Sequence, residues 1–133
     1  MERLAACMFL CRRDVNKRIE RYSQLISTIE EDKDVFEPHS PLSLREEEKN
    51  EVKVVFNGDV YLMTKRPRNY LLLRLDSFMS DQAAVYNHKV ITVEHVLPQT
   101  VNTGTYWSKM WPNPASREKW VHKLGNLLLL SKS

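Results

Sequence analysis

The sequence lacks the features that mark several common classes of protein. Three glycines and 9% aromatic residues argue against a glycine-rich β protein and against a low-complexity chain. It has no glycine loop of the type that cradles phosphates. No hydrophobic run approaches the roughly 20 residues of a membrane span, and the first ten residues lack the small-residue cleavage site of a signal peptide. We therefore expect a cytoplasmic protein with no membrane segment.

The overall composition is that of an ordinary soluble domain. The 133 residues are 42% hydrophobic and 28% charged, enough to bury a single core. The formal net charge of +3 permits binding to nucleic acid without requiring it. Two cysteines, Cys7 and Cys11, lie four residues apart, which suits a buried apolar role better than a disulfide or a metal site.

Helical spacing dominates the first half of the chain. One long helix is predicted over residues 2–31, because apolar residues recur there at three-, four- and seven-residue steps. A second helix is predicted after Ser43, with Glu46 completing a capping box and Gly58 following its end. Residues 68–80 predict a third helix, apolar on most sides and therefore central to the core. The middle of the first helix has a basic run that is either a solvated face or a phosphate-facing stripe: Arg12, Arg13, Lys17, Arg18 and Arg21.

The second half predicts two strands and a short helix. Residues 90–93 are β-branched and predict a strand that ends at Glu94 and His95. Residues 100–114 resemble a loop, and residues 116–123 predict a short helix capped by Ser116. The apolar residues 124–130 suit a second strand, whereas residues 60–63 and the polar connection 81–88 give no firm assignment.

A carboxylate and an imidazole are adjacent where the first strand ends. Because successive strand side chains point to opposite faces, Glu94 and His95 reach one site only if the strand ends or bulges there. A carboxylate can hold Mg²⁺, which prefers oxygen ligands, and a neutral histidine can take a proton from an attacking water. Taken alone, such a pair is more often an ordinary surface or core feature than a site.

Two longer motifs point to a known family. Residues 92–99, TVEHVLPQ, resemble the (D/E)-H-(I/V)-x-P-Q signature that opens the ββα-metal site of HNH nucleases. Residues 120–131, WVHKLGNLLLLS, resemble the following L-G-N-L-x-L-L stretch of one branch, the DUF1524 family, which forms the C-terminal part of GmrSD-type, modification-dependent restriction endonucleases. Residues 70–76, YLLLRLD, are also similar to that family. The resemblance covers residues 44–133, with the motifs in the expected order.

The resemblance implies roles for three residues. His95 would be the general base that activates water, and Glu94 would help to hold Mg²⁺ or another divalent metal such as Mn²⁺. Asn126 would fix the loop between the strands and orient the histidine. Without the resemblance, Asn126 is a simple turn residue after Gly125.

Other residues give weaker signals. Near the site, the candidate DNA contacts are His122, Lys123, Arg68 and Arg74. The alternative for His122 is a helix-end residue that interacts with the helix dipole. A zinc site formed by His88, His95 and His122 lacks the support of paired cysteines or short histidine spacing. The three tryptophans either stack on bases or pack the long loop onto the core: Trp107, Trp111 and Trp120.

These observations predict an α+β fold, mostly helical, in which helices pack on a small antiparallel β-hairpin of an incomplete ββα-metal unit. Residues 1–43 would be a helical arm and residues 44–133 the nuclease-like domain. The family pattern continues into a further helix with a metal ligand. Since the sequence stops before it, we expect these residues alone to cleave little.

The predicted function is metal-dependent cleavage of foreign or modified DNA, together with an N-terminal DUF262-like domain or a partner subunit. The first alternative is a catalytically inactive module that binds DNA or a protein partner and keeps the HNH scaffold. The second is a helical interaction domain in which the Glu-His pair is coincidental.

Overall fold

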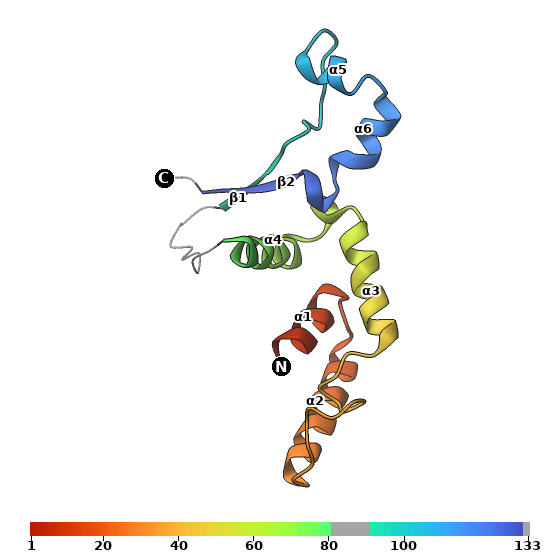
Figure 1. The fold of residues 1–133 in the computed structure, drawn as a ribbon, viewed down its shortest axis with the longest axis vertical. Coiled ribbons are helices and arrows are strands. Elements are labelled where there is room, and N and C mark those ends of the chain that lie inside the picture. The colour runs from red at the N-terminus through yellow and green to blue at the C-terminus, as the bar shows by residue number, and fades with distance from the viewer. Residues whose placement is uncertain (81–90, 132–133) are drawn as a thin grey trace. The chain divides into compact units, whose positions relative to one another are not determined.

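The computed structural model describes residues 1–80 and 91–131, which form helices and one two-stranded sheet. Two compact units divide the chain, residues 1–55 and 56–133. The predicted boundary between a helical arm (residues 1–43) and a nuclease-like domain (residues 44–133) marks where the family resemblance begins, and it stays a prediction. In the described residues no helix is long and apolar enough to cross a membrane. Figure 1 labels the elements, which are α1 (Glu2–Leu10), α2 (Val15–Glu30), α3 (Glu46–Asn57), the 3₁₀ turn η1 (Val60–Leu62), α4 (Lys65–Met79), β1 (Ile91–His95), α5 (Tyr106–Met110), α6 (Pro114–Val121), the 3₁₀ turn η2 (Leu124–Asn126) and β2 (Leu127–Ser131).

The N-terminal segment is two helices, so the prediction of one helix over residues 2–31 is wrong. Arg12 adopts a positive φ of 51°, a left-handed conformation that interrupts the helix. The Asp14 side chain then accepts a hydrogen bond from the Asn16 amide at 2.8 Å and caps α2. Aspartate competes with the helical backbone in this way, and here the cap prevails over the apolar periodicity.

A buried ion pair organises the first unit. Arg21 donates to the Pro41 and Ser43 carbonyl oxygens, at 2.6 Å each, and its guanidinium lies 3.4 Å from Glu48. Glu48 also accepts from the Arg45 amide at 2.8 Å, so it supplies the capping interaction of α3 that we predicted for Glu46. The buried apolar residues of this unit come from α1 and α2: Leu4, Cys7, Met8, Leu10 and Leu25.

The second unit contains the sheet. Strands β1 and β2 pair antiparallel with a register from Ile91–Ser131 to His95–Leu127, and α4 contacts β2 (Figure 1). This arrangement confirms the predicted fold class. The apolar core of the unit comprises Val60, Leu71, Leu72, Leu97, Val121 and Leu127. Helix α4 is buried only in its first half, since Phe78 near its end is 71% exposed.

The segment between the strands holds two helices, so the loop predicted over residues 100–114 is wrong for α5. Thr105 begins α5 and accepts from the Ser108 amide at 3.4 Å. Asn113, rather than the predicted Ser116, caps α6 by accepting from the Ala115 amide at 2.9 Å. Pro114 follows at the first helical position, where its missing N–H costs nothing.

Candidate active site

His95 is the last residue of β1, opposite Leu127 of β2. Side chains alternate along a strand, so His95 shares the inner face with Leu127, which is 7% exposed. Glu94 lies opposite Leu128, which is 52% exposed. The strand pairs regularly up to His95 without a bulge. Glu94 and His95 therefore leave β1 on opposite faces and can meet only beyond its end.

The rings of Tyr61 and His122 lie close to the inner side of His95. The Tyr61 ring, from η1, lies 4.2 Å from the His95 ring, centroid to centroid, with an edge-on angle of 64°. The His122 ring stacks on Tyr61 at 5.4 Å and lies 5.6 Å from His95. The Tyr61 amide also donates to the His122 carbonyl oxygen at 3.1 Å. The ring cluster of Tyr61, His95 and His122 is thus held by backbone as well as side-chain contacts.

Arg68 joins the ring cluster from α4. Its Nη1 donates to the Tyr61 carbonyl oxygen at 2.8 Å, and its guanidinium carbon lies 4.9 Å from the Tyr61 ring centroid, within the range of a cation–π contact. Arg74 lies further along the same helix, where it contacts the Phe78 ring at 4.3 Å. Of the two arginines named from the sequence, only Arg68 lies against the ring cluster.

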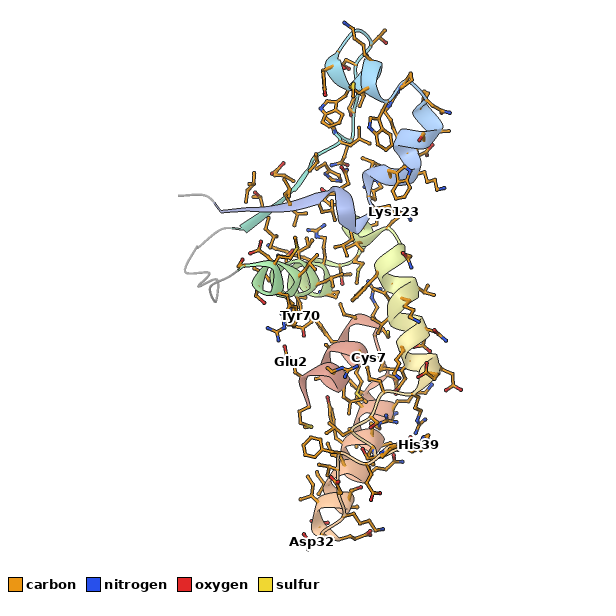
Figure 2. The ribbon with its side chains drawn as sticks, viewed as in Figure 1. Glu2, Cys7, Asp32, His39, Tyr70 and Lys123 are labelled. Atoms are coloured by element: carbon orange, nitrogen blue, oxygen red, sulfur yellow. The ribbon has the colours of Figure 1, made fainter. Side chains whose placement is uncertain are left out.

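Lys123, labelled in Figure 2, follows His122 in the sequence. Its ammonium group pairs with Asp59 at 2.9 Å and donates to the Asn57 carbonyl oxygen at 3.0 Å. These contacts fasten the start of η1 to the end of α6, so Lys123 helps to position Tyr61.

The ring cluster affects the charge of His95. Burial is the main cause that lowers the pKa of His95 below 6.5, and His122 lowers it further, whereas Glu94 opposes the shift. The His95 Nε2 atom is buried and has no hydrogen-bond partner in the described part of the chain. Nδ1 lies 3.4 Å from the Gln99 amide nitrogen on the exposed side. The imidazole is therefore neutral near pH 7, with Nδ1 as its more accessible nitrogen.

Asn126 fastens the turn that follows His95. Its Oδ1 accepts from the Leu97 amide at 2.6 Å, while Nδ2 donates to the carbonyl oxygens of Leu97 at 3.0 Å and Val121 at 2.8 Å. The Asn126 carbonyl oxygen also accepts from the Val96 amide at 3.0 Å. One side chain thus joins the turn after β1 to the end of α6, an arrangement suited to fixing a loop.

Residues 46–133 match the family of C-terminal domains of GmrSD restriction endonucleases. The chain belongs to this family. No curated protein and no solved structure matches the chain significantly. Membership of the GmrSD family places the chain among restriction-type nucleases, whose substrate is DNA.

Within the motif of this GmrSD domain, Glu94 supplies the carboxylate that could hold a divalent metal. Across residues 1–80 and 91–131, no three His, Cys, Asp or Glu side chains gather in a way that could hold a metal ion. Glu94 is exposed, and Mg²⁺ is commonly held by one or two carboxylates together with water and substrate phosphates. Of the three histidines in the zinc alternative, His95 and His122 lie close together, and His88 lies outside the described residues.

A hollow lies beside Asn126 in the GmrSD domain. Its volume is about 230 Å³, and Leu97, Trp111, Trp120, Lys123, Gly125 and Asn126 line it. Trp120 is 48% exposed, with the Lys119 ammonium 5.7 Å from its ring centroid. Trp111 and Trp120 therefore border the turn that Asn126 fixes, and Trp120 remains accessible to solvent.

Sequence reasoning missed Tyr61 and gave Gln99 no role. Tyr61 lies in residues 60–63, a stretch that carries no periodic signal, and its contacts with His95 and His122 depend on tertiary packing. Gln99 belongs to the motif that opens with Glu94, so its position four residues after His95 was the available signal. Both residues contact the imidazole directly.

Proposed function

We propose that this chain is the metal-dependent DNA endonuclease domain of a modification-dependent restriction protein, in which His95 activates water for phosphodiester hydrolysis. The placement of His95 carries the proposal, because a neutral, half-buried imidazole ends the motif strand of a domain from a nuclease family. A neutral histidine within reach of water is suited to general-base catalysis.

His95 Nδ1 is the atom that would take the proton. The Gln99 side-chain amide nitrogen, which can only donate, lies closest to Nδ1, so we place the ring proton of the neutral imidazole on the buried Nε2 and leave Nδ1 as the acceptor. Gln99 contacts Nδ1 at 3.4 Å and would orient the ring until substrate and water enter. The Tyr61 ring packs against His95 and Asn126 fixes the turn that follows it, and both would help to preserve the orientation of the imidazole.

Glu94 is the residue that would hold the divalent cation, Mg²⁺ or Mn²⁺. The bound cation would neutralise charge on the scissile phosphate and its leaving oxygen. Its remaining positions would be filled by substrate, water and other residues, as is usual for magnesium.

DNA would approach from the side on which the basic residues lie. Arg68 contacts the ring cluster, and we propose that it and His122 face the phosphate next to the one that is cut. Lys123 would act less directly, since Asp59 and the Asn57 carbonyl oxygen already engage its ammonium group. For Arg74 we propose a contact further along the duplex. Recognition of a modified base would belong to an N-terminal DUF262-like domain or a partner subunit.

Plasmid nicking tests the proposal. We expect the chain to convert supercoiled plasmid slowly to the nicked form with Mg²⁺ or Mn²⁺, and not at all with EDTA. The His95→Asn variant should lose about 10²–10⁴-fold in rate, the usual contribution of a general base. His39→Asn is the matched control. His39 is exposed and has a φ of 73°, a conformation that asparagine tolerates, so its rate should not change.

The alternative function is a catalytically inactive module that binds DNA or a protein partner. It would be favoured if modified and unmodified plasmids both stay intact while the chain still binds DNA in a salt-dependent manner. Equal nicking by the wild-type chain and His95→Asn would refute the assignment of His95 as the base.

A further inference from the structure

The hollow beside Asn126 is small and is bordered by two indole rings. Its volume of about 230 Å³ is below the roughly 300–1,000 Å³ of pockets that bury a drug-sized ligand, so it suits one small planar group. All of its lining residues lie between positions 97 and 126, within the second unit. We propose that the hollow is a subsite for one unstacked nucleobase of the DNA strand that is cut. The subsite rests on the proposed function, because it takes DNA as the substrate.

The lining of the hollow favours stacking over the reading of a base edge. Trp120 is 48% exposed, so this lining indole can receive a base, and aromatic stacking accepts every base because each has a π face. Two polar groups of the lining are already engaged. The Asn126 amide nitrogen donates to two carbonyl oxygens, and the Lys123 ammonium group pairs with Asp59. We therefore expect the subsite to bind all four bases without strong sequence preference.

Gly125 leaves open space at the hollow. It is one of the lining residues, and a Cβ atom at this position would meet no atom beyond its chain neighbours within 4 Å. A larger side chain at this position would therefore extend into free space rather than into packed atoms. Substitution of Gly125 can thus fill the hollow while its walls stay in place.

The hollow lies close to His95 along the chain. Leu97 of its wall is two residues after His95, and two residues span at most about 7 Å. Asn126 joins the same turn by accepting from the Leu97 amide at 2.6 Å. Since successive phosphates of one strand are about 3.4 Å apart along the duplex axis, this span corresponds to roughly two nucleotides. A strand whose scissile phosphate reaches His95 would thus have a flanking base within reach of the hollow.

The charges around the hollow favour a nucleotide over an apolar ligand. Residues 117–123 contain three basic residues and one acidic residue. Arg117 donates to the Trp111 carbonyl oxygen. The Lys119 ammonium group lies 5.7 Å from the Trp120 ring centroid. Positive charge is therefore held beside both indoles, where it would attract the phosphates that flank a stacked base.

A base can enter the hollow only after it has left the helical stack. Unstacking costs least for a base that is mismatched or already unpaired. The subsite should therefore favour DNA with an unpaired base over a fully paired duplex. The substrate class that follows is DNA with an unpaired base beside the scissile phosphate.

Fluorescence anisotropy of labelled duplexes tests the proposal on the whole chain, in EDTA so that no metal-dependent cleavage occurs. One duplex carries a bulged adenine, and the other carries an abasic site at the same place. The adenine should tighten binding about tenfold, within the range of base–aromatic stacking. Trp120→Leu should remove this preference, whereas Trp120→Phe, which keeps a ring, should retain most of it. Tyr106→Leu is the matched control, because Tyr106 is 66% exposed on α5 and does not line the hollow.

Gly125→Leu tests the hollow by filling it. This variant should lose the preference for the bulged adenine, because the added side chain occupies the place of the base. Its binding to the abasic duplex should stay unchanged, since that duplex does not use the hollow. Circular dichroism of each variant checks that the chain still folds.

The outcomes separate the subsite from the proposed cleavage. Equal binding of the two duplexes by the wild-type chain, binding of neither, a preference that survives both Trp120→Leu and Gly125→Leu, or an equal loss in Tyr106→Leu would each overturn the subsite. A preference that disappears in both hollow variants supports the subsite even if plasmid stays intact, in which case only the proposed cleavage fails. Nicking that depends on His95 without any preference for the bulged base would overturn the subsite alone.

Discussion

Replacing Asn126 should cost the second unit about 3 kcal/mol of unfolding free energy. The side chain makes three hydrogen bonds, to the Leu97 amide and to the Leu97 and Val121 carbonyl oxygens. Each contributes about 0.5–1.5 kcal/mol net, and Asn126→Ala removes all three while leaving their backbone partners unpaired. Asn126→Asp should cost at least as much, because a carboxylate would then face two carbonyl oxygens.

Urea denaturation followed by tryptophan fluorescence measures this effect. All three tryptophans lie in residues 56–133, so the signal reports on the unit that contains Asn126. Asn102→Ala is the matched control, since Asn102 is exposed in the loop before α5, and its change should stay within about 0.5 kcal/mol. A loss below about 1 kcal/mol in Asn126→Ala, or a loss equal to the control, would refute the idea that this amide fixes the turn after His95.

Three further predictions concern titration and burial. In NMR titrations His95 should have a midpoint below 6.5. Because the pKa of His95 is higher in the unfolded chain, the unfolded chain binds the proton more readily. The stability of the second unit should therefore fall as pH drops from about 6.5 toward the folded pKa of His95. A midpoint above 6.5 would contradict the lowered pKa. Burial, followed by Cys11, raises the pKa of Cys7 from 9.0 to about 12. Cys11→Ser leaves burial as the main cause, so a thiol reagent at pH 8 should react at least about tenfold more slowly with the folded variant than with the urea-unfolded variant; equal rates would show that the thiol is accessible. Glu48→Ala breaks the buried pair with Arg21 and should lower the unfolding free energy of the first unit by about 3 kcal/mol. Urea denaturation monitored by circular dichroism measures this loss. A loss near zero would mean that the carbonyl partners of Arg21 are enough to stabilise its buried charge.

The sequence predicted well where local chemistry decides the outcome. The β-branched run before His95 forms a strand, and the apolar run after Asn126 forms its partner. The family was identifiable because its motifs are short, contiguous and rich in polar residues.

The prediction failed where two local signals compete. Apolar periodicity continues through residues 11–14, but the cap at Asp14 and the left-handed Arg12 divide the helix. Before α6, the Thr105 cap allows the five-residue helix α5. The tryptophans and prolines of this segment had favoured the prediction of a loop.

The ring cluster could not be derived from the sequence. Tyr61, His95 and His122 come from three distant segments, and only tertiary packing brings them together. Strand alternation predicts that the Glu94 and His95 side chains point to opposite faces. Only the observed register of β1 and β2 shows that no bulge interrupts the strand before His95.

The pairing of β1 with β2 has a consequence for how the protein is made. Ile91 pairs with Ser131, so the strand that carries His95 is synthesised well before its partner exists. At roughly 5–20 residues added per second, that delay is on the order of seconds. During it the strand has two open edges, and Asn126, which fastens the turn after His95, has yet to be added. His95 of a nascent chain would therefore be fixed in place only after nearly all of these residues had been synthesised, which would limit the period in which the DNA cleavage proposed above could damage DNA near a growing chain.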